Sequence, residues 1–371
     1  MLELITAGES HGAGILCVLS GFPAGFEIDL EAVCAELTRR QNCAGRSSRK
    51  DLEKNAVEVL SGMRQGRTIG SPITIFIRNA DSTIDKRKPN PVPRPGHAEL
   101  PGMIRYGTKD ATDIAERASA RETAGRVAGG AICSQLLAEL GVHVFGCTIA
   151  IGSEWAEAFE IPESAIALEE LRALRNSNPY YAVQATGQWD RILSGAEKEG
   201  DTVGGVFGVI SVGAPPGLGR PVQWTGNLDG RIARSLMSIQ AVKAVEFGAG
   251  AAGIELTGSE YHGNIEMNAE GEPAHTTRTH GGILGGMTDG TPITVRCAVK
   301  PIPTTGRDMT SVNLETGEAV KRKTERHDIC AVPAASVIGE HVLAFELCRA
   351  TLERFGASSV DELRERIASV D

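Results

Sequence analysis

The order of strand-like and helix-like segments constrains this fold more than any other feature of the chain. Apolar, β-branched runs predict strands at residues 15–19, 56–60, 72–77, 142–151, 205–212 and 292–299. Apolar residues at helical spacing predict helices at residues 30–40, 113–140, 164–175, 232–245, 333–355 and 360–370. Because the two kinds of segment do not alternate strictly, the pattern argues against a doubly wound parallel sheet. It favours one large α+β domain, or a tightly fused pair, over residues 1–371.

The helix predicted at 113–140 has the most unusual composition. Asp113 stands where an N-cap is expected. Alanine and glycine dominate the middle of the segment, including Gly129 and Gly130. Small side chains allow another backbone to approach closely, although each glycine costs a helix about 1 kcal/mol. We therefore expect this helix to pack tightly against its neighbours.

The other helices and the loops follow familiar end signals. Asp29 precedes helix 30–40 as an N-cap, and helix 333–355 has a proline in its first turn. Residues 41–50 are polar and predict a mobile loop, whereas the prolines of 79–96 predict a stiff, irregular segment that presents His97.

Composition excludes several classes of function. The net charge of -9 and the aromatic share of 4% argue against a nucleic-acid surface, which needs basic groups and stacking rings. No apolar run approaches the ~18 residues of a membrane span, and the N-terminus lacks the pattern of a signal peptide. The 8 cysteines form no Cys-x-x-Cys pair. We expect a cytoplasmic protein with reduced core cysteines and no metal site.

Two glycine motifs resemble well-known functional signatures. Residues 8–12 match the Gly-x-Ser-x-Gly nucleophile elbow, but that elbow must follow a strand and open a helix, and here a strand-like run follows. Residues 248–253 match Gly-x-Gly-x-x-Gly, but they follow a helix-like segment instead of a strand. We therefore interpret the second motif as a turn and expect neither a serine hydrolase nor a dinucleotide site.

Histidines and arginines supply the candidate chemistry. His11 lies between glycines at the start of a strand, and His97 follows prolines, so both rings are held in restricted backbone. A histidine near its ordinary pKa of about 6.5 exchanges protons at neutral pH. Arg117 and Arg121 are four residues apart, which would place them on one helix face. Guanidinium groups bind carboxylates and phosphates through paired hydrogen bonds, so we expect an anionic substrate.

Several blocks in fixed order resemble the chorismate synthase family over nearly the whole chain. They are Thr6–Gly12, Arg39–Gln41, Arg94–Ala98, Glu116–Thr123, Val245–Gly248, Gly281–Gly286, Lys300–Thr304 and 326–328. The resemblance implies an α+β sandwich with helices packed between antiparallel sheets, and a homotetramer. It also implies a carbon–oxygen lyase that eliminates phosphate from 5-enolpyruvylshikimate-3-phosphate (EPSP) to give chorismate, using reduced FMN without net redox change.

The resemblance also assigns site residues. Its implied catalytic residues are His11, which would protonate or stabilise the departing phosphate, His97, which would manage the charge of reduced flavin, Asp328 near flavin N5, and Ser10 as a relay. The implied substrate ligands are Arg40, Arg46, Arg94 and Arg121. The implied flavin contacts are Arg117, Ala118, Ser119, Gln240, Ala241, Gly285, Lys300, Pro301, Ile302, Pro303, Thr304 and Arg326.

Some positions depart from the family pattern. Glu99 replaces an aspartate, and Thr112 and Asp113 replace a common Arg-Asn pair, which removes one basic group. Thr279 and the residues of 42–50 also differ, which affects loop detail only.

Three alternatives stay open at this stage. A non-catalytic flavin-binding protein would not need Ser10, His11, His97 and Asp328 together. A phosphatase acting on the same substrate would need a metal or a water-activating group. A bifunctional chain that reduces its own flavin with NADPH would need an inserted segment, so an external reductant is expected instead.

Overall fold

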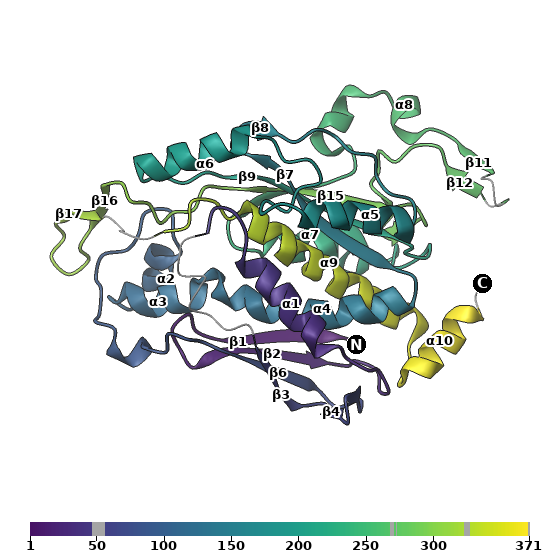
Figure 1. The fold of residues 1–371 in the computed structure, drawn as a ribbon, viewed down its shortest axis with the longest axis horizontal. Helices are drawn as coiled ribbons and strands as arrows, with labels where there is room; N and C mark the ends of the chain where they lie inside the picture. Colours follow the sequence, from purple (N-terminus) through teal and green to yellow (C-terminus); the bar gives the residue numbers. More distant parts are fainter. Residues whose placement is uncertain (47–55, 268–270, 272, 323–326, 370–371) are drawn as a thin grey trace.

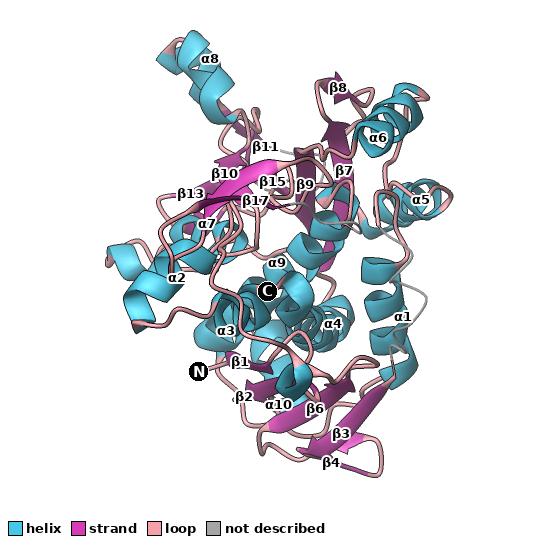
Figure 2. Ribbon diagram, turned by 90° about the vertical axis from the view of Figure 1, so that its left-hand side faces the viewer, coloured by secondary structure: helices cyan, strands magenta, loops and turns pink. Residues whose placement is uncertain are grey.

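The computed structural model describes residues 1–46, 56–267, 271, 273–322 and 327–369. Two large antiparallel sheets flank a central layer of helices (Figures 1 and 2). The first sheet has the order β1 (Glu3–Gly8), β2 (Gly14–Ser20), β6 (Ile73–Arg78), β3 (Val57–Ser61). The second has the order β10 (Val242–Phe247), β15 (Ile293–Val299), β9 (Gly205–Val212), β7 (His143–Ile151), β8 (Glu154–Trp155).

Helices fill the space between the sheets. They are α1 (Leu30–Gln41), α4 (Thr123–Glu139), α7 (Leu228–Met237) and α9 (Val332–Phe355). Helix α4 packs on β1 and β2, α9 packs on β7 and β9, and the two helices contact each other. The main hydrophobic core includes residues from both sheets and all four helices. This arrangement confirms the expected sandwich of helices between antiparallel sheets.

Glycines set the spacing of the layers around α4. A Cβ added at Gly129 would lie 2.5 Å from Leu4 Cδ1 in the first sheet. A Cβ added at Gly130 would lie 2.2 Å from the carbonyl oxygen of His341 in α9. Both separations are far below van der Waals contact; the backbone at Gly130 cannot move aside, so only glycine fits there, whereas at Gly129 the tip of the Leu4 side chain would have to shift. The close packing expected from the composition of this helix is confirmed.

Smaller elements surround the sandwich. They are β4 (Met63–Arg64), β5 (Arg67–Thr68), η2 (Ile84–Lys86), α2 (Glu99–Tyr106), α3 (Ala111–Ala118), η3 (Ala120–Glu122), α5 (Ala165–Asn176), α6 (Gln188–Glu199), η4 (Trp224–Gly226), η5 (Gly250–Glu255), α8 (Gly258–His262), β11 (Ile265–Met267), β12 (Pro273–His275), β13 (Ile283–Leu284), β14 (Met287–Thr288), β16 (Met309–Val312), β17 (Ala319–Arg322) and α10 (Val360–Ala368). Elements α8, β11 and β12 project from the second sheet (Figure 1).

Most predicted elements are confirmed within one or two residues, including all six predicted strands and the helices α1, α5, α9 and α10. Asp29 caps α1 by accepting from the backbone N–H of Ala32. All 8 cysteines carry free thiols, and 7 of them are buried, as expected of core residues. The part of the predicted loop 41–50 beyond residue 46 lies outside the described residues.

Three predictions about secondary structure are wrong. The helix predicted at 113–140 is divided at Ser119, whose ψ of 141° is extended, and its cap is Asp110, not Asp113. The helix predicted at 232–245 ends at Met237, and β10 follows because residues 242–247 pair with β15. The glycine motif at 248–253 therefore follows a strand, although it leads into the short 3₁₀ helix η5 and not an α-helix.

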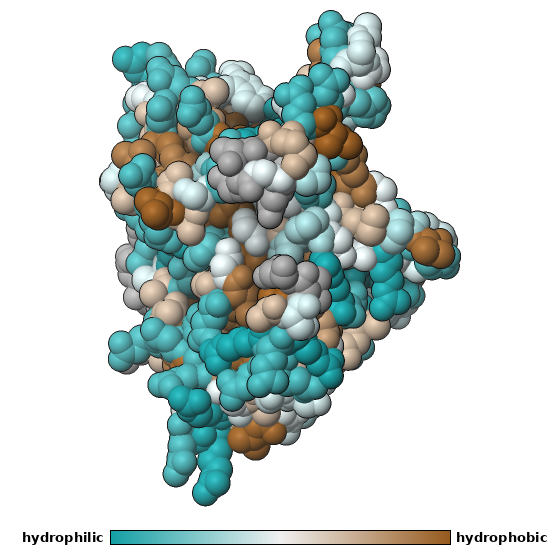
Figure 3. Space-filling view, turned by 90° about the vertical axis from the view of Figure 1, so that its right-hand side faces the viewer, coloured by the Kyte–Doolittle hydropathy of each residue, from teal (hydrophilic) through white to brown (hydrophobic). Residues whose placement is uncertain are grey.

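Hydrophobic side chains lie scattered among hydrophilic ones on the face shown in Figure 3. Within the described ranges, no helix has both the length and the apolar character needed to cross a membrane.

Candidate active site

His11 lies in the turn between β1 and β2, and not at the start of a strand as predicted. Glu116 of α3 holds this turn from the other side. Its Oε2 accepts the backbone N–H of His11 at 2.7 Å, and its Oε1 lies 2.8 Å from His11 Nδ1. The backbone N–H of Ser10 donates to the carbonyl of Glu116 at 3.1 Å. His11 and Ser10 are both nearly buried, so their positions are fixed by α3. Residues 8–12 lead into β2 and not a helix, so they form no nucleophile elbow.

Ser119 connects the end of α3 to this turn. Its hydroxyl donates to Ser10 Oγ at 3.2 Å and accepts the backbone N–H of Arg121 at 3.3 Å. The break at Ser119 means that Arg117 and Arg121 do not share a helix face, which corrects the prediction. Arg117 donates to the carbonyl of Thr6, whereas Arg121 Nε donates to Asn79 Oδ1 at 2.9 Å.

An arginine cluster lies beside Ser119. Arg40 is buried, and it donates to Thr123 Oγ1 at 2.9 Å and to the carbonyl of Ala120 at 2.8 Å. Burial, followed by repulsion from Arg46 and Arg121, lowers the pKa of Arg40 from its ordinary 12.5 to about 9. The structure therefore concentrates positive charge where water has little access, as an anion-binding site requires.

Asp328 joins the arginine cluster through Arg46. Arg46 NH1 lies 2.8 Å from Asp328 Oδ2, and both side chains are about one-quarter exposed. Arg40, Arg46, Arg121 and Asp328 were predicted to belong to one site, and the structure brings them together.

His97 lies in a second basic cluster at the start of α2. Glu99 accepts from Arg94 Nε at 2.6 Å and lies 3.3 Å from Arg322 NH1, while Arg94 NH2 lies 3.5 Å from His97 Nδ1. Burial, followed by repulsion from Arg94, lowers the pKa of His97 to about 4 despite the opposing charge of Glu99. His97 is therefore neutral at physiological pH.

The segment at 300–306 connects the two clusters. Lys300 Nζ donates to the carbonyl of Gly96 at 2.8 Å, and Thr304 Oγ1 accepts from Arg94 at 3.1 Å. At its other end, a Cβ added at Gly306 would lie 3.0 Å from the ring of His327, the neighbour of Asp328. These contacts place Pro301, Ile302 and Pro303 between the clusters.

The remaining predicted flavin contacts differ in how they relate to the two clusters. The backbone N–H of Lys300 donates to the carbonyl of Ala241, and Gln240 Nε2 donates to Glu122 Oε2 at 3.3 Å. Ala118 ends α3 directly before Ser119. Gly285 turns the β13–β14 hairpin, and no contact among the described residues joins it to either cluster. Arg326 lies outside the described residues.

Sequence reasoning missed several partners of the site. Glu116 and Asn79 both contact it through polar side chains, and Arg87 lies 3.6 Å from Glu116. Glu122 lies four residues before Arg126, a spacing typical of a surface ion pair, and it does pair with Arg126. It is buried, and it also accepts from Thr6 Oγ1. Only the polar character of Asn79 just after a strand offered a local signal.

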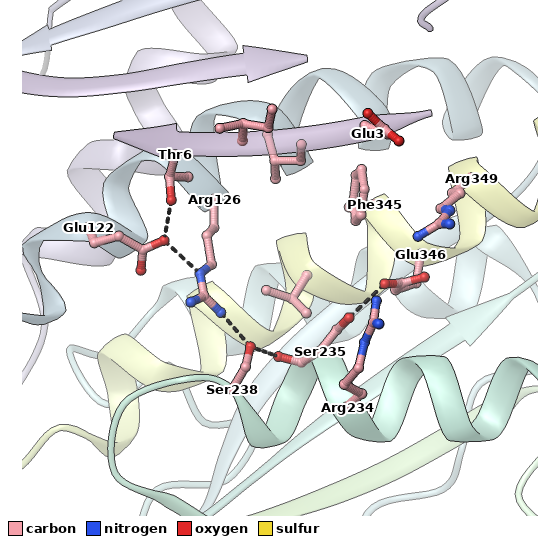
Figure 4. Close-up of a pocket in the computed structure, with 13 residues that line it drawn as sticks. Glu3, Thr6, Glu122, Arg126, Arg234, Ser235, Ser238, Phe345, Glu346 and Arg349 are labelled. Carbon is pink, nitrogen blue, oxygen red and sulfur yellow. Dashed lines mark hydrogen bonds and ion pairs between the residues drawn. The ribbon is translucent and has the colours of Figure 1, made fainter. Parts of the chain in front are cut away.

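A cavity of about 390 Å³, lined in part by Glu122, lies between β1, α4, α7 and α9 (Figure 4). Arg126 spans it by donating to Glu122 and to Ser238 Oγ, which lies at 2.7 Å. None of the predicted site residues lines this cavity. Some of its polar groups pair with one another, as Arg126 does with Glu122 and Ser235 does with Glu346. No group of three or more metal-ligating side chains occurs in the part of the chain that the structure describes.

This sandwich, with the buried Arg40 and further arginines in two clusters that also hold two histidines and a carboxylate, defines an enzyme that binds a multiply anionic substrate. The family model for chorismate synthase matches residues 2–352. The chain is 45% identical to chorismate synthase of Desulforudis audaxviator over 98% of its length and 95% of the relative's. It is 42% identical to that of Aquifex aeolicus over 98% and 96% of the two chains.

A crystal structure of chorismate synthase superimposes with a TM-score of 0.81 at 34% identity, covering 100% of this chain and 97% of the other. The chain therefore belongs to the chorismate synthase family. It is a carbon–oxygen lyase of the shikimate pathway, which forms chorismate by eliminating phosphate from EPSP.

Proposed function

We propose that the arginine cluster and His11 form the phosphate side of the site, and that reduced FMN is the cofactor. The observation that carries this proposal is the burial of Arg40 close to Arg46 and Arg121, whose repulsion adds to the effect of burial in lowering the pKa of Arg40 to about 9. The phosphate and the carboxylates of EPSP would be attracted to this concentration of positive charge. Arg40, Arg46, Arg121 and, from the second cluster, Arg94 are the proposed substrate ligands.

His11 is the proposed acid of the reaction. Its Nδ1 is directed to Glu116, so Nε2 is the ring nitrogen proposed to face the leaving group. A proton held there would neutralise charge that develops on the departing phosphate oxygen. Ser10, hydrogen-bonded to Ser119, is the proposed relay between this region and Asp328.

The second cluster fits an anionic flavin. Lys300, the hydroxyl of Thr304 and the neutral ring of His97 provide a cation, hydrogen-bond donors and an uncharged partner for a ring system. Residues 117–119, Gln240, Ala241, 300–304, Gly285 and Arg326 are the proposed flavin contacts. The chemistry that reduced FMN supplies when bound is the transient transfer of an electron to the substrate. His97 and Asp328 would hold protons and charge near it.

The same proposal extends to the organisation of the enzyme. The main core contains residues from Leu2 to Leu363, which supports one domain over the whole chain. An external reductant is proposed, because the aligned 98% of the chain matches relatives whose names give chorismate synthase alone. We further propose a homotetramer in the cytoplasm.

An anaerobic assay tests the proposal. The protein is mixed with EPSP and dithionite-reduced FMN, and chorismate absorbance is followed together with phosphate release. Equal amounts of both products, absent with oxidised FMN, are expected. Phosphate without chorismate would indicate hydrolysis, and neither product would refute the cofactor assignment. Replacing dithionite with NADPH should give no product unless a separate reductase is added.

A further inference from the structure

We propose that Glu116 is the positioning residue of His11, and that its carboxylate fixes which ring nitrogen faces the substrate. This inference rests on the proposed acid role of His11. It concerns a residue that sequence reasoning did not assign to the site.

The geometry of the pair leaves one arrangement of protons. Glu116 is about 5% exposed, and its two carboxylate oxygens contact the backbone N–H and the ring Nδ1 of the same histidine. A carboxylate only accepts hydrogen bonds. Nδ1 must therefore carry a proton, and the neutral ring is held as the Nδ1–H tautomer with Nε2 as its basic atom.

The backbone contact adds a second constraint. Because Oε2 accepts the N–H of His11 at 2.7 Å, the carboxylate cannot rotate away from the ring without losing that bond. The carbonyl of Glu116 also accepts from Ser10. Three hydrogen bonds thus tie α3 to the turn that carries His11, so the ring is fixed in position as well as in tautomer.

Other charges face the pair from the segment after β6. Asp81 Oδ2 lies 3.8 Å from His11 Nε2, and Arg87 lies 3.8 Å from Asp81 and 3.6 Å from Glu116. Asp81 is partly exposed, whereas Glu116 is buried, so solvent screens the Asp81 charge more strongly. Glu116 is therefore the dominant carboxylate acting on the ring.

The proton balance of the step follows from this arrangement. In the elimination the carbon–oxygen bond to phosphate breaks with its electron pair on the phosphate oxygen, while the ring C–H bond breaks, its electron pair enters the new double-bond system and its proton leaves toward the proposed Asp328 side of the site. That oxygen takes the proton from Nε2 of the imidazolium, and the ring returns to its neutral Nδ1–H form, still bonded to Glu116. Without the carboxylate, the imidazolium would be less stable and the neutral ring could adopt either tautomer.

The test compares Glu116→Gln with the wild-type enzyme. NMR of ¹⁵N-labelled histidine reports the tautomer, with His11→Asn identifying the signal, and the pH profile of kcat reports proton donation. We expect wild-type His11 to show Nδ1–H, and Glu116→Gln to show a mixed or reversed tautomer. The basic limb of kcat should move to lower pH by about one unit, and kcat should fall about 10- to 100-fold with a smaller change in KM.

Two further variants separate positioning from folding. Glu116→Asp keeps a carboxylate and should restore most of the pH profile. Glu346→Gln removes another buried carboxylate, which lies in α9 and accepts hydrogen bonds from Arg231 and Ser235 of α7, and should leave the His11 signal unchanged. If His11 keeps the same tautomer in Glu116→Gln and the pH profile does not move, the proposal is wrong, even if kcat falls. The NMR result stands whether or not the enzyme forms chorismate, so failure of the proposed acid role would be recognised separately.

Discussion

Replacing Arg40 with methionine should make the ligand-free protein more stable while destroying its function. Arg40 is buried near two other arginines, and the attraction of Glu122 is weaker than their repulsion. Methionine has a flexible, unbranched side chain that can occupy much of the same buried space without carrying a charge. The expected gain therefore comes from removing a buried charge that the empty site does not neutralise.

The magnitude follows from the contacts. A pKa lowered from 12.5 to about 9 corresponds to an upper limit of about 5 kcal/mol, at about 1.4 kcal/mol for each pH unit. The hydrogen bonds of Arg40 to Thr123 and Ala120 would be lost. However, Thr123 Oγ1 also donates to the carbonyl of Ala120 at 2.6 Å, so these partners satisfy each other. We expect a net gain of about 1–3 kcal/mol, within the range found when buried ionic groups are replaced by apolar ones.

Urea unfolding at one protein concentration measures the free energy of unfolding with and without EPSP. At a concentration of 100 times its Kd, EPSP should stabilise the wild type by about 2.7 kcal/mol. The Kd for EPSP should be higher in Arg40→Met by about 30-fold or more, so the same EPSP concentration should stabilise this variant much less. Arg175→Met is the matched control, because Arg175 is equally buried but pairs with Glu340 at 2.8 Å. It should destabilise the protein by about 3–5 kcal/mol.

The reasoning about Arg40 fails if Arg40→Met unfolds at lower urea than the wild type with an unchanged m-value. It also fails if EPSP stabilises both proteins equally. A gain in stability with intact substrate binding would mean that Arg40 lies outside the substrate site.

Three other outcomes are expected. In thermal melts, Gly130→Ala should destabilise the protein by about 1–3 kcal/mol, because the added Cβ would overlap His341. Gly195→Ala is the control: this position in α6 has open space around it, so the alanine should stabilise the protein by about 0.5–1 kcal/mol. Equal effects of the two substitutions would contradict the packing argument. Lys300→Met should raise the pKa of His97 from about 4, measured by NMR titration, since Lys300 lowers it; an unchanged value would disprove their coupling. Because the pKa of His97 lies below the ordinary 6.5, the free energy of unfolding should fall as pH drops from about 6.5 through 4, and it should fall less in His97→Gln. Identical curves of unfolding free energy against pH for the two proteins would contradict this.

Secondary structure could be predicted from the sequence where the local hydrophobic pattern of a segment agrees with its burial in the folded protein. Helix α9 and strand β15 were predicted because they are long, strongly apolar and bounded by clear end signals. The break at Ser119 was missed because alanine-rich residues favour helix throughout. It exists because the Ser119 hydroxyl bonds to Ser10, more than 100 residues away. Strand β10 was missed because pairing with β15 overrides the helical propensity of its residues.

The residues of the candidate site also divide into those that local sequence signals could identify and those that only the fold brings to the site. His11, His97 and the arginines could be singled out from their residue types and local spacing, and the family resemblance grouped them. Glu116 could not be found this way, because nothing near it in the chain distinguishes it from a surface carboxylate. Only the packing of α3 against the turn after β1 brings it to His11.

The glycine contacts of α4 limit how descendants of this chain can change in length. Inserting a single residue within α4 would rotate everything after it by about 100°. Gly129 would then no longer face Leu4, Gly130 would no longer face α9, and bulky side chains would take their places. Such an insertion could not be offset by one later substitution, because both layers would need repair at once. Heritable insertions and deletions should therefore accumulate in the outer loops, while the interval from Thr123 to Glu139 keeps a constant length across lineages.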